Sequence, residues 1–505
     1  MSVVLACDLG GTSLRAALVD REGDVLAQRA IASVPVSVDA RGGSEVDADD
    51  WWRAFVAVAG ELAADAPERF RQVRAVAICG ITRTQVLLGN DGRLLRPAMT
   101  WQDARAEAML GELAGRLPGA HPETKQVSAF HPVARLAWLH RHEAHTLGGL
   151  TTVLDPKDYL NFRLTGEKAS DRISMARLIA ASEPWPPAPD LLTAIGVPRA
   201  ILPRIVDPWE RIGSILGEAP EPLNRLAGVP VLCGSNDTWS AVVGLGALRP
   251  GHAYNISGTT EVFGVLSAEP AEADGLVTLD WGGVHQLGGP GQNGAGTLAW
   301  LLSLLGPAGA NAPPVGEAIA ALLAGERHEQ PLLFLPYLQG ERVPHWDPDL
   351  RGAFAGLGRG HTAADMAWAV LEGVAFHNRL VLGRAEKALG RPVQEIRFGG
   401  GGASNPVWCQ IKADVCERPI VTAASSEAGI LGAAALAWTG LGAFASLADA
   451  QQRLVRIARR YEPDADRAAF YRPLFDLFER TGRALAPVSH ELVALGRALM
   501  KSRAE

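Results

Sequence analysis

Two segments of the chain share one pattern, in which an apolar run enters a turn of glycine and threonine and a second apolar run follows. They cover residues 6–20 and 253–266. Each pattern predicts a β-hairpin, because glycine accepts backbone angles and close approaches that other residues do not. Backbone N–H groups in such a bend can bind an anion such as phosphate. The turn residues are Gly10, Gly11, Thr12 and Ser13 in the first hairpin and Gly258, Thr259 and Thr260 in the second.

One such hairpin opens each half of the chain, which predicts a duplicated domain with both bends facing one nucleotide. The length of 505 residues supports this interpretation, since it is too great for a single hydrophobic core. A punctuating Arg-Pro-Gly sequence lies at residues 249–251. We therefore expect two domains, residues 1–246 and residues 247–505.

Charge and composition favour a small-molecule partner. The net charge is −7, aromatic residues are few and no basic stripe occurs, which argues against nucleic acid or an anionic membrane. The five cysteines are scattered without a close pair, which argues against a metal knuckle and favours a reducing cytoplasm. Neither a signal peptide nor a membrane span is expected. The sequence is compatible with a homodimer.

A continuous apolar run over residues 73–81 predicts a strand buried on both faces. Thr82 and Arg83 follow it, at the end of the strand where open α/β sheets bind ligands. Farther on, Trp101 and Asp103 lie two residues apart, and an aromatic ring beside a carboxylate suits a polyhydroxylated ligand. The plainer interpretation of that pair is a core tryptophan followed by an exposed helix start.

Asp237 follows a second buried strand and a Gly-Ser-Asn sequence, directly before a helix rich in small residues. Aspartate is favoured as a helix cap, which is the structural interpretation. An ionised carboxylate at the end of a strand is also what a general base requires. Asp8, within the first apolar run, could hold a metal directly or through water.

Four glycines at residues 399–402 connect a predicted strand to a helix that starts after Asn405. The absence of side chains there allows a flat ring or a ribose to lie against the backbone. A long helix is predicted over residues 363–389, a helix rich in alanine and glycine over 428–439, and a more polar helical tail from about residue 446. Four histidines at or near residues 131–145 are interpreted as solvated, since they show no metal-binding pattern.

These motifs together resemble those of the FGGY carbohydrate kinases, and the resemblance covers nearly the whole chain. Residues 8–13 look like the first phosphate loop of the family, and residues 400–405 look like its adenosine loop. Residues 130–139 follow the first family signature, with Arg135 where lysine is usual. Residues 352–372 fit the second signature.

The resemblance implies an α/β fold of two ribonuclease-H-like domains, as in the actin-like ATPase superfamily, with a central cleft. It also implies transfer of the γ-phosphoryl of ATP to a sugar or polyol hydroxyl, with Mg²⁺. Asp237 would be the catalytic base, and Asp8 would position the metal. The other implied contacts are Gly11, Thr12, Ser13, Gly258 and Thr259 for phosphate, Gly401, Gly402 and Asn405 for adenosine, and Thr82, Arg83, Trp101, Asp103 and Asp237 for the sugar.

The resemblance leaves the substrate open. Residues 156–166 look most like xylulokinases, which implies a ketopentose such as xylulose. Xylulokinases typically carry Gly-Gln-Met-His-Gly where this chain has Gly80 to Gln85, and Arg83 resembles a substrate arginine of glycerol kinases. Glycerol, erythritol or another polyol is therefore the alternative.

Three other functions share parts of the pattern. A glucokinase-like kinase uses a similar first loop but often carries a Cys/His zinc cluster, which this sequence lacks. An actin-like or chaperone-like ATPase would act on a protein partner, and a pseudokinase would have lost catalysis. The sugar-type segment at residues 101–105 argues against the former, and retention of Asp8 and Asp237 argues against the latter.

Overall fold

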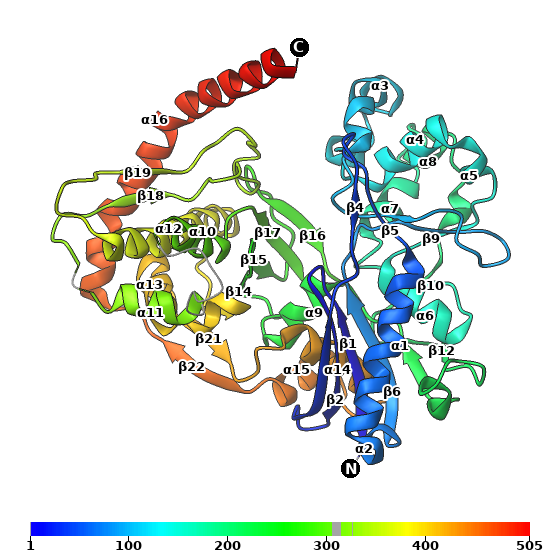
Figure 1. Cartoon of the computed structure of the whole chain (residues 1–505). Helices are drawn as coiled ribbons and strands as arrows, with labels where there is room; N and C mark the ends of the chain where they lie inside the picture. Colours follow the sequence, from blue (N-terminus) through cyan, green and yellow to red (C-terminus); the bar gives the residue numbers. More distant parts are fainter. Residues whose placement is uncertain (1, 306–314, 326, 505) are drawn as a thin grey trace. The chain divides into compact units, whose positions relative to one another are not determined.

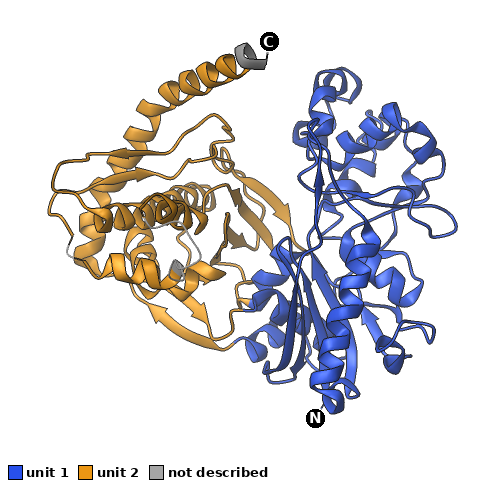
Figure 2. Cartoon of the chain, in the orientation of Figure 1, with its two compact units in different colours: residues 1–244, 427–455 blue, residues 245–426, 456–505 orange. Residues whose placement is uncertain are grey.

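The computed structural model describes residues 2–305, 315–325 and 327–504. The chain divides into two compact units (Figure 2). Unit 1 comprises residues 1–244 and 427–455, and unit 2 comprises residues 245–426 and 456–505. The expected division lies after residue 246, whereas the first segment of unit 1 ends at residue 244 and residues 427–455 also pack with the first half of the chain.

The main sheet of unit 1 has six strands in the order β12-β13-β6-β1-β2-β3 (Figure 1). β1 pairs antiparallel with β2 and parallel with β6, and β6 pairs parallel with β13, so the first predicted hairpin is confirmed. The strands are β1 (Val3–Leu9), β2 (Ser13–Asp20), β3 (Val25–Ala32), β6 (Val73–Gly80), β12 (Arg211–Ser214) and β13 (Pro230–Leu232).

Helices and three small sheets surround this main sheet. The helices of unit 1 are α1 (Ala48–Asp65), α2 (Pro67–Phe70), α3 (Leu110–Arg116), α4 (Pro132–His142), α5 (Ala144–Gly148), α6 (Pro156–Thr165), α7 (Ala176–Ser182), α8 (Leu191–Ala194), α9 (Asp237–Gly244), α14 (Ala428–Gly440) and α15 (Leu447–Leu454). The short strands are β4 (Ser37–Val38), β5 (Ser44–Val46), β7 (Val86–Leu88), β8 (Ala98–Met99), β9 (Thr152–Leu154), β10 (Ala169–Asp171) and β11 (Arg204–Val206).

Unit 2 contains a seven-stranded sheet in the order β16-β17-β15-β14-β20-β21-β22. β14 pairs antiparallel with β15, which confirms the second predicted hairpin, and parallel with β20. The strands are β14 (His252–Ser257), β15 (Glu261–Ser267), β16 (Val277–Asp280), β17 (His285–Gly291), β20 (Glu395–Gly399), β21 (Ile420–Ala423) and β22 (Ile457–Tyr461), with β18 (Leu333–Leu335) and β19 (Ala353–Ala355) in a separate pair.

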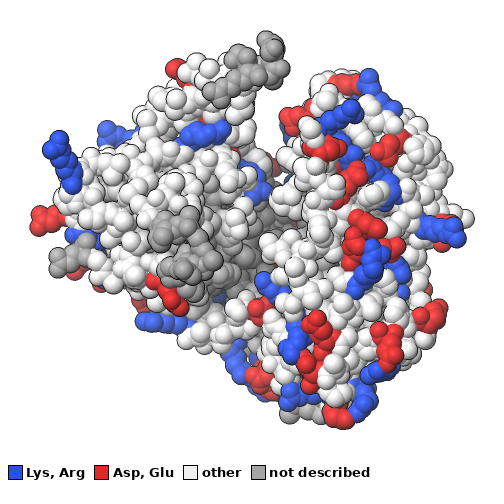
Figure 3. Space-filling model, in the orientation of Figure 1, with Lys and Arg blue, Asp and Glu red and all other residues white. Residues whose placement is uncertain are grey.

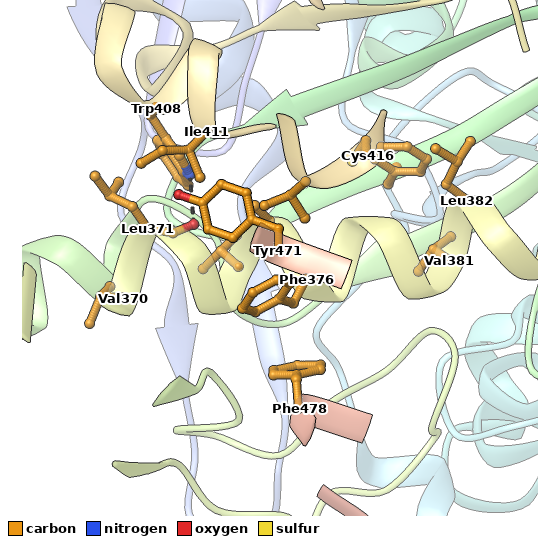
Figure 4. Packing of buried hydrophobic residues seen from close by; sticks show 14 of the residues in the cluster. Val370, Leu371, Phe376, Val381, Leu382, Trp408, Ile411, Cys416, Tyr471 and Phe478 are labelled. Atoms are coloured by element: carbon orange, nitrogen blue, oxygen red, sulfur yellow. Dashed lines mark hydrogen bonds between the residues drawn. The ribbon is translucent and has the colours of Figure 1, made fainter. Parts of the chain in front are cut away.

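The helices of unit 2 are α10 (Gly296–Leu305), α11 (Val315–Leu323), α12 (Ala363–Leu389), α13 (Pro406–Cys416) and α16 (Ala465–Ala504). α12 has the predicted bounds for a local reason: Thr362 and Asp365 form a capping box at its start, and Gly390 in a left-handed conformation ends it. Its apolar face packs with α13 and α16 in the core shown in Figure 4, where the indole N–H of Trp408 donates to the carbonyl of Leu371 at 3.1 Å.

Two local predictions were wrong. His131 was interpreted as solvated, but it is 5% exposed: its Nδ1 accepts from the N–H of Val133 and its Nε2 lies 2.9 Å from Glu123. The ring therefore caps α4, and burial lowers its pKa. Residues 457–461 were included in a helical tail, but they form β22, which extends the sheet through β21. Edge strands such as this one have mostly exposed residues and lack a buried pattern.

On the face in Figure 3, basic and acidic side chains are interspersed. Among the helices that the structure describes, none combines the length and the apolar character needed to cross a bilayer.

The contact between α9 and α14 in unit 1 generates a stability prediction. A Cβ added at Gly432 would overlap the backbone carbonyl of Ser240, whereas one at Gly383 of α12 would meet nothing within 4 Å. Gly432→Ala should therefore lower the free energy of unfolding by about 1–3 kcal/mol, as overpacking does elsewhere. Gly383→Ala is the matched control and should be neutral or stabilising. Chemical denaturation measures both, and equal effects would contradict close packing of α9 on α14.

Candidate functional site

The chain that follows β13 continues along the end of β6. The N–H of Gly80 donates to the carbonyl of Ser235 at 3.3 Å, and Gly80 forms an isolated bridge with Asn236. Gly234 has a φ of 72°, and a Cβ there would overlap the carbonyl of Ile78. Only glycine fits this close approach, which carries the chain from β13 to the first residue of α9, Asp237.

Asn236, not Asp237, caps α9. The side-chain oxygen of Asn236 accepts from the N–H of Trp239 at 2.8 Å. The half-buried carboxylate of Asp237 accepts from the N–H of Thr238 at 2.6 Å. Burial raises the pKa of Asp237, which brings the carboxyl closer to the range where it can accept a proton at neutral pH. The cap predicted at Asp237 is therefore provided by Asn236, and the carboxylate of Asp237 is not needed for it.

Asp8 lies near the end of β1. Burial, together with the nearby charge of Asp237, raises its pKa to about 6. The thiol of Cys79 donates to Asp8 Oδ1 at 3.6 Å. Gly429, near the start of α14, lies against this carboxylate, because a Cβ there would overlap Asp8 Oδ2. Sequence reasoning missed Gly429, which is one of several small residues in that helix.

The first turn begins at Gly10, directly after the last residue of β1. It is closed by a hydrogen bond from the N–H of Gly10 to the carbonyl of Ser13 at 3.0 Å. Gly11 and Thr12 are exposed, and nothing lies within 4 Å of a Cβ added at Gly11. Because β1, β6 and β13 are parallel, this turn shares one edge of the sheet with Asp237 and Arg83.

The predicted phosphate and adenosine residues of unit 2 also share one sheet edge. β14 and β20 are parallel neighbours, with Ile256 opposite Gly399, so their following loops lie side by side. In the second turn, Gly258 and Thr259 are exposed, and their carbonyls accept from the N–H groups of Ala295 and Gly296 at 2.8 and 3.2 Å.

The glycines of residues 400–402 differ in what surrounds them. A Cβ at Gly400, where φ is 81°, would lie 2.5 Å from the carbonyl of Ser257, and one at Gly402 would lie 2.8 Å from the Trp408 ring. Gly401 is exposed and nothing lies within 4 Å of its added Cβ. Asn405 caps α13, with its oxygen accepting from the N–H groups of Val407 and Trp408. Gly400 and Gly402 are therefore required by packing, and Gly401 is open to a ligand.

Arg83 is exposed in a left-handed conformation, with a φ of 56°. Such a conformation is strained for a residue other than glycine and is commonest at functional sites. The fully buried guanidinium of Arg135 donates to the carbonyl of Arg83 at 2.5 Å and to that of Phe130 at 2.6 Å. Thr82 donates to Asp155 Oδ2 at 2.9 Å.

Two exposed aromatic residues flank the Arg83 turn. The N–H of Trp101 donates to the hydroxyl of Thr84 at 3.1 Å, and the Trp101 side chain is 39% exposed. Phe130 is 44% exposed and is fixed beside Arg83 by Arg135. Sequence reasoning did not select Phe130 as a contact, although a large apolar residue just before a helix cap was a usable signal. An aromatic face suits the C–H groups of a sugar.

Asp103 is fully buried, and its carboxylate already has partners. It accepts from the N–H of Ser44 at 2.9 Å and from Arg105 Nη2 at 2.6 Å, while the Arg105 guanidinium lies over the Trp138 ring. These contacts give Asp103 a structural role. Contact with a substrate stays a prediction for this residue.

The structure thus gathers the predicted residues into one group in each unit. The groups are Asp8, Gly11, Thr12, Ser13, Thr82, Arg83, Trp101 and Asp237 in unit 1, and Gly258, Thr259, Gly401, Gly402 and Asn405 in unit 2. The first combines carboxylates, a guanidinium and aromatic faces. The second combines exposed backbone with a flat, glycine-lined surface.

Comparisons with known proteins agree with this chemistry. The N-terminal domain of the FGGY family of carbohydrate kinases matches residues 3–244, and the C-terminal domain of that family matches residues 253–441. Xylulose kinase from Escherichia coli is 30% identical over 96% of this chain and 99% of its own, and glycerol kinase from Dechloromonas aromatica is 31% identical over 91% and 93%.

Among solved structures, xylulose kinase from Rhodospirillum rubrum is similar, with a TM-score of 0.83 and 28% identity over 97% of this chain and 100% of the other. The match spans the two-domain α/β architecture of the actin-like ATPase fold. Together with the match of both family domains, this shows that the chain belongs to the FGGY family of carbohydrate kinases and is a sugar kinase.

Proposed function

We propose that this kinase transfers the γ-phosphoryl of ATP to a hydroxyl of a ketopentose such as xylulose, with Asp237 as general base. The observation that carries the proposal is the state of the Asp237 carboxylate. It is half-buried at a strand end, is not needed as the cap of α9, and has a raised pKa. A carboxylate in that state can orient an accepting hydroxyl and take its proton.

ATP is assigned to the loops of unit 2. The exposed turn at Gly258 and Thr259 suits a phosphate group, and the open surface at Gly401 suits the adenosine. The turn at Gly11 to Ser13 would contact the phosphates from unit 1. Phosphoryl transfer depends chiefly on positioning and on neutralising charge, which backbone donors supply without reorganising.

Asp8 fits a role in holding Mg²⁺. Its carboxyl has a pKa raised to about 6 because it is buried near Asp237, and a cation would relieve that cost. Within the ranges that the structure describes, no cluster of three or more His, Cys, Asp or Glu side chains could enclose a metal. Mg²⁺ commonly binds through one or two carboxylates with waters and substrate phosphates. When bound, it would neutralise charge on the phosphates.

The acceptor is assigned to the Arg83 turn. Arg83 is exposed, and its turn is linked through backbone groups to two exposed aromatic residues, Trp101 and Phe130, a combination that suits a molecule with several hydroxyls. A ketopentose is favoured because several relatives are named xylulose kinases. A polyol such as glycerol or erythritol is the second candidate, and Arg83 together with the glycerol kinase relative favours it. A cytoplasmic location is supported by the five buried, free cysteines.

The function is tested by ADP release with ATP and Mg²⁺ against D-xylulose, D-ribulose, xylitol, glycerol, erythritol and gluconate. We expect D-xylulose to give the strongest response. Asp237→Asn should retain ATP binding and lose at least about a hundredfold in kcat, the usual contribution of one general base. A response to glycerol or erythritol alone would select the second candidate. Unchanged turnover of Asp237→Asn would remove Asp237 from its assigned role.

The adenosine assignment makes a separate prediction. Because a Cβ added at Gly401 has no neighbour within 4 Å, Gly401→Val should fold normally and weaken ATP binding by obstructing the open surface. Sugar affinity should change much less. Gly217→Val, at an exposed glycine of unit 1 that is equally open, is the matched control. Calorimetric titration with ATP measures the difference, and a loss confined to sugar binding would exclude adenosine at this loop.

The raised pKa of Asp8 makes a prediction about stability. A carboxyl whose folded pKa is about 6, against 3.8 ordinarily, is harder to ionise in the folded chain. The contribution of Asp8 to the free energy of unfolding is fully present below about pH 4 and is lost as the pH rises through about 6. Asp8→Asn should therefore raise the melting temperature of the nucleotide-free protein at pH 8 and leave it nearly unchanged at pH 4. Equal melting temperatures for Asp8→Asn and the wild type at both pH values would contradict this cost of burial.

A further inference from the structure

A lysine and two carboxylates are buried beneath the strand end that carries Asp237. The Lys157 ammonium lies 2.5 Å from Asp158 Oδ1 and 2.9 Å from Asp171 Oδ2, and all three side chains are at most 1% exposed. Burial opposes a charge on Lys157, but the two carboxylates outweigh it and raise the lysine pKa. We refer to Lys157, Asp158 and Asp171 as the buried ion cluster.

The buried ion cluster contacts the Asp237 strand end at two points. The ammonium of Lys157 donates to the carbonyl of Cys233 at 3.4 Å, and that carbonyl also accepts from the Asn161 amide at 2.8 Å. The hydroxyl of Ser235 donates to Asp171 Oδ1 at 2.8 Å. Ser235 is fully buried and lies two residues before Asp237.

A second arm of the cluster leads to the Arg83 turn. The N–H of Asp155 donates to Asp158 Oδ2 at 3.2 Å, and Asp155 Oδ2 accepts from the hydroxyl of Thr82 at 2.9 Å. Two of the segments that carry predicted substrate contacts in unit 1, those of Thr82 and Asp237, are therefore bonded to one set of buried charges.

Buried ion pairs are a costly way to stabilise a fold, because apolar residues of the same volume often serve as well or better. Charged groups give directional hydrogen bonds, which fix a backbone more narrowly than apolar packing does. The cluster lies under the two segments whose relative placement the reaction needs, and a misplacement of 1 Å in such a site can cost about a hundredfold in rate.

We propose that the buried ion cluster, acting through Ser235, positions the general base Asp237, and that Ser235 and Asp171 are positioning residues for phosphoryl transfer. This inference rests on the proposed role of Asp237. Neither residue is assigned any contact with a substrate. Each acts on the backbone that leads into α9.

Ser170 provides a matched control inside the same cluster. Its hydroxyl donates to Asp158 Oδ2 at 2.6 Å, and it is as fully buried as Ser235. It lies on β10 and has no bond to the strand end that carries Asp237. A merely structural role for the cluster would make Ser170→Ala and Ser235→Ala equivalent.

The experiment compares Ser235→Ala and Ser170→Ala by melting temperature, kcat, and KM for ATP and sugar. We expect similar losses of melting temperature. Ser235→Ala should lose about tenfold in kcat, as a displaced general base would. KM for ATP should stay within about twofold, because the loop assigned to adenosine and the second phosphate turn lie in unit 2. Ser170→Ala should retain kcat. Equal kcat for the two variants would overturn the proposal.

A double-mutant cycle with Asp237→Asn tests whether Ser235 affects kcat through Asp237. If Ser235 acts through Asp237, adding Ser235→Ala to Asp237→Asn should lower kcat by less than about twofold further. An additive tenfold loss would overturn the proposal. Should Ser235→Ala fail to fold, Ser235→Cys keeps the size with a weak donor and takes its place in both tests.

These outcomes are distinct from failure of the proposed function. Absence of sugar-dependent ADP release in the wild type, or an active Asp237→Asn, would refute the proposed function. An active wild type with an inactive Asp237→Asn and a fully active Ser235→Ala would refute only the positioning role.

Discussion

The parallel pairing of β6 with β1 on one side and β13 on the other is the constraint on which the site in unit 1 depends. Three buried strands that run in the same direction end at the same edge, so their following residues are brought together although they are far apart in sequence. Asp8, Arg83 and Asp237 each come from a different strand. β14 and β20 apply the same principle in unit 2, where the second turn meets the glycine-rich loop.

The arrangement has an energetic cost that is visible at Asp8. A carboxylate with a pKa raised to about 6 is held beside a second carboxylate, with the thiol of Cys79 and the backbone at Gly429 against it. A fold selected only for stability would not retain this pair. The nucleotide-free protein therefore carries an electrostatic cost at the place where the proposed chemistry occurs. A cation bound with its nucleotide would reduce the repulsion between the two carboxylates.

Local signals predicted most of the fold. The two hairpins, the bounds of α12 and the strand before Thr82 follow from apolar runs, glycine turns and capping residues, which act over a few neighbours. The candidate residues were found because short motifs mark strand ends. Their partners were not predictable in the same way, because those partners come from distant parts of the chain. The bonds from Ser44 to Asp103, from Arg135 to Arg83 and from Ser235 to Asp171 join residues 52 to 64 positions apart. Nothing in the local pattern near Asp103 shows which neighbour will use its carboxylate.

The return of residues 427–455 to unit 1 has a consequence for the order in which the chain folds. α14 packs on α9 and β1, and its Trp438 indole donates to the carbonyl of Asp20 at 2.9 Å. When the ribosome has just synthesised α9, the main sheet of unit 1 still lacks α14, the helix that covers it. Nearly 200 further residues, the greater part of unit 2, must emerge before the helix becomes available. The first half therefore completes its folding late in synthesis, and its uncovered strands need protection from aggregation in the interval.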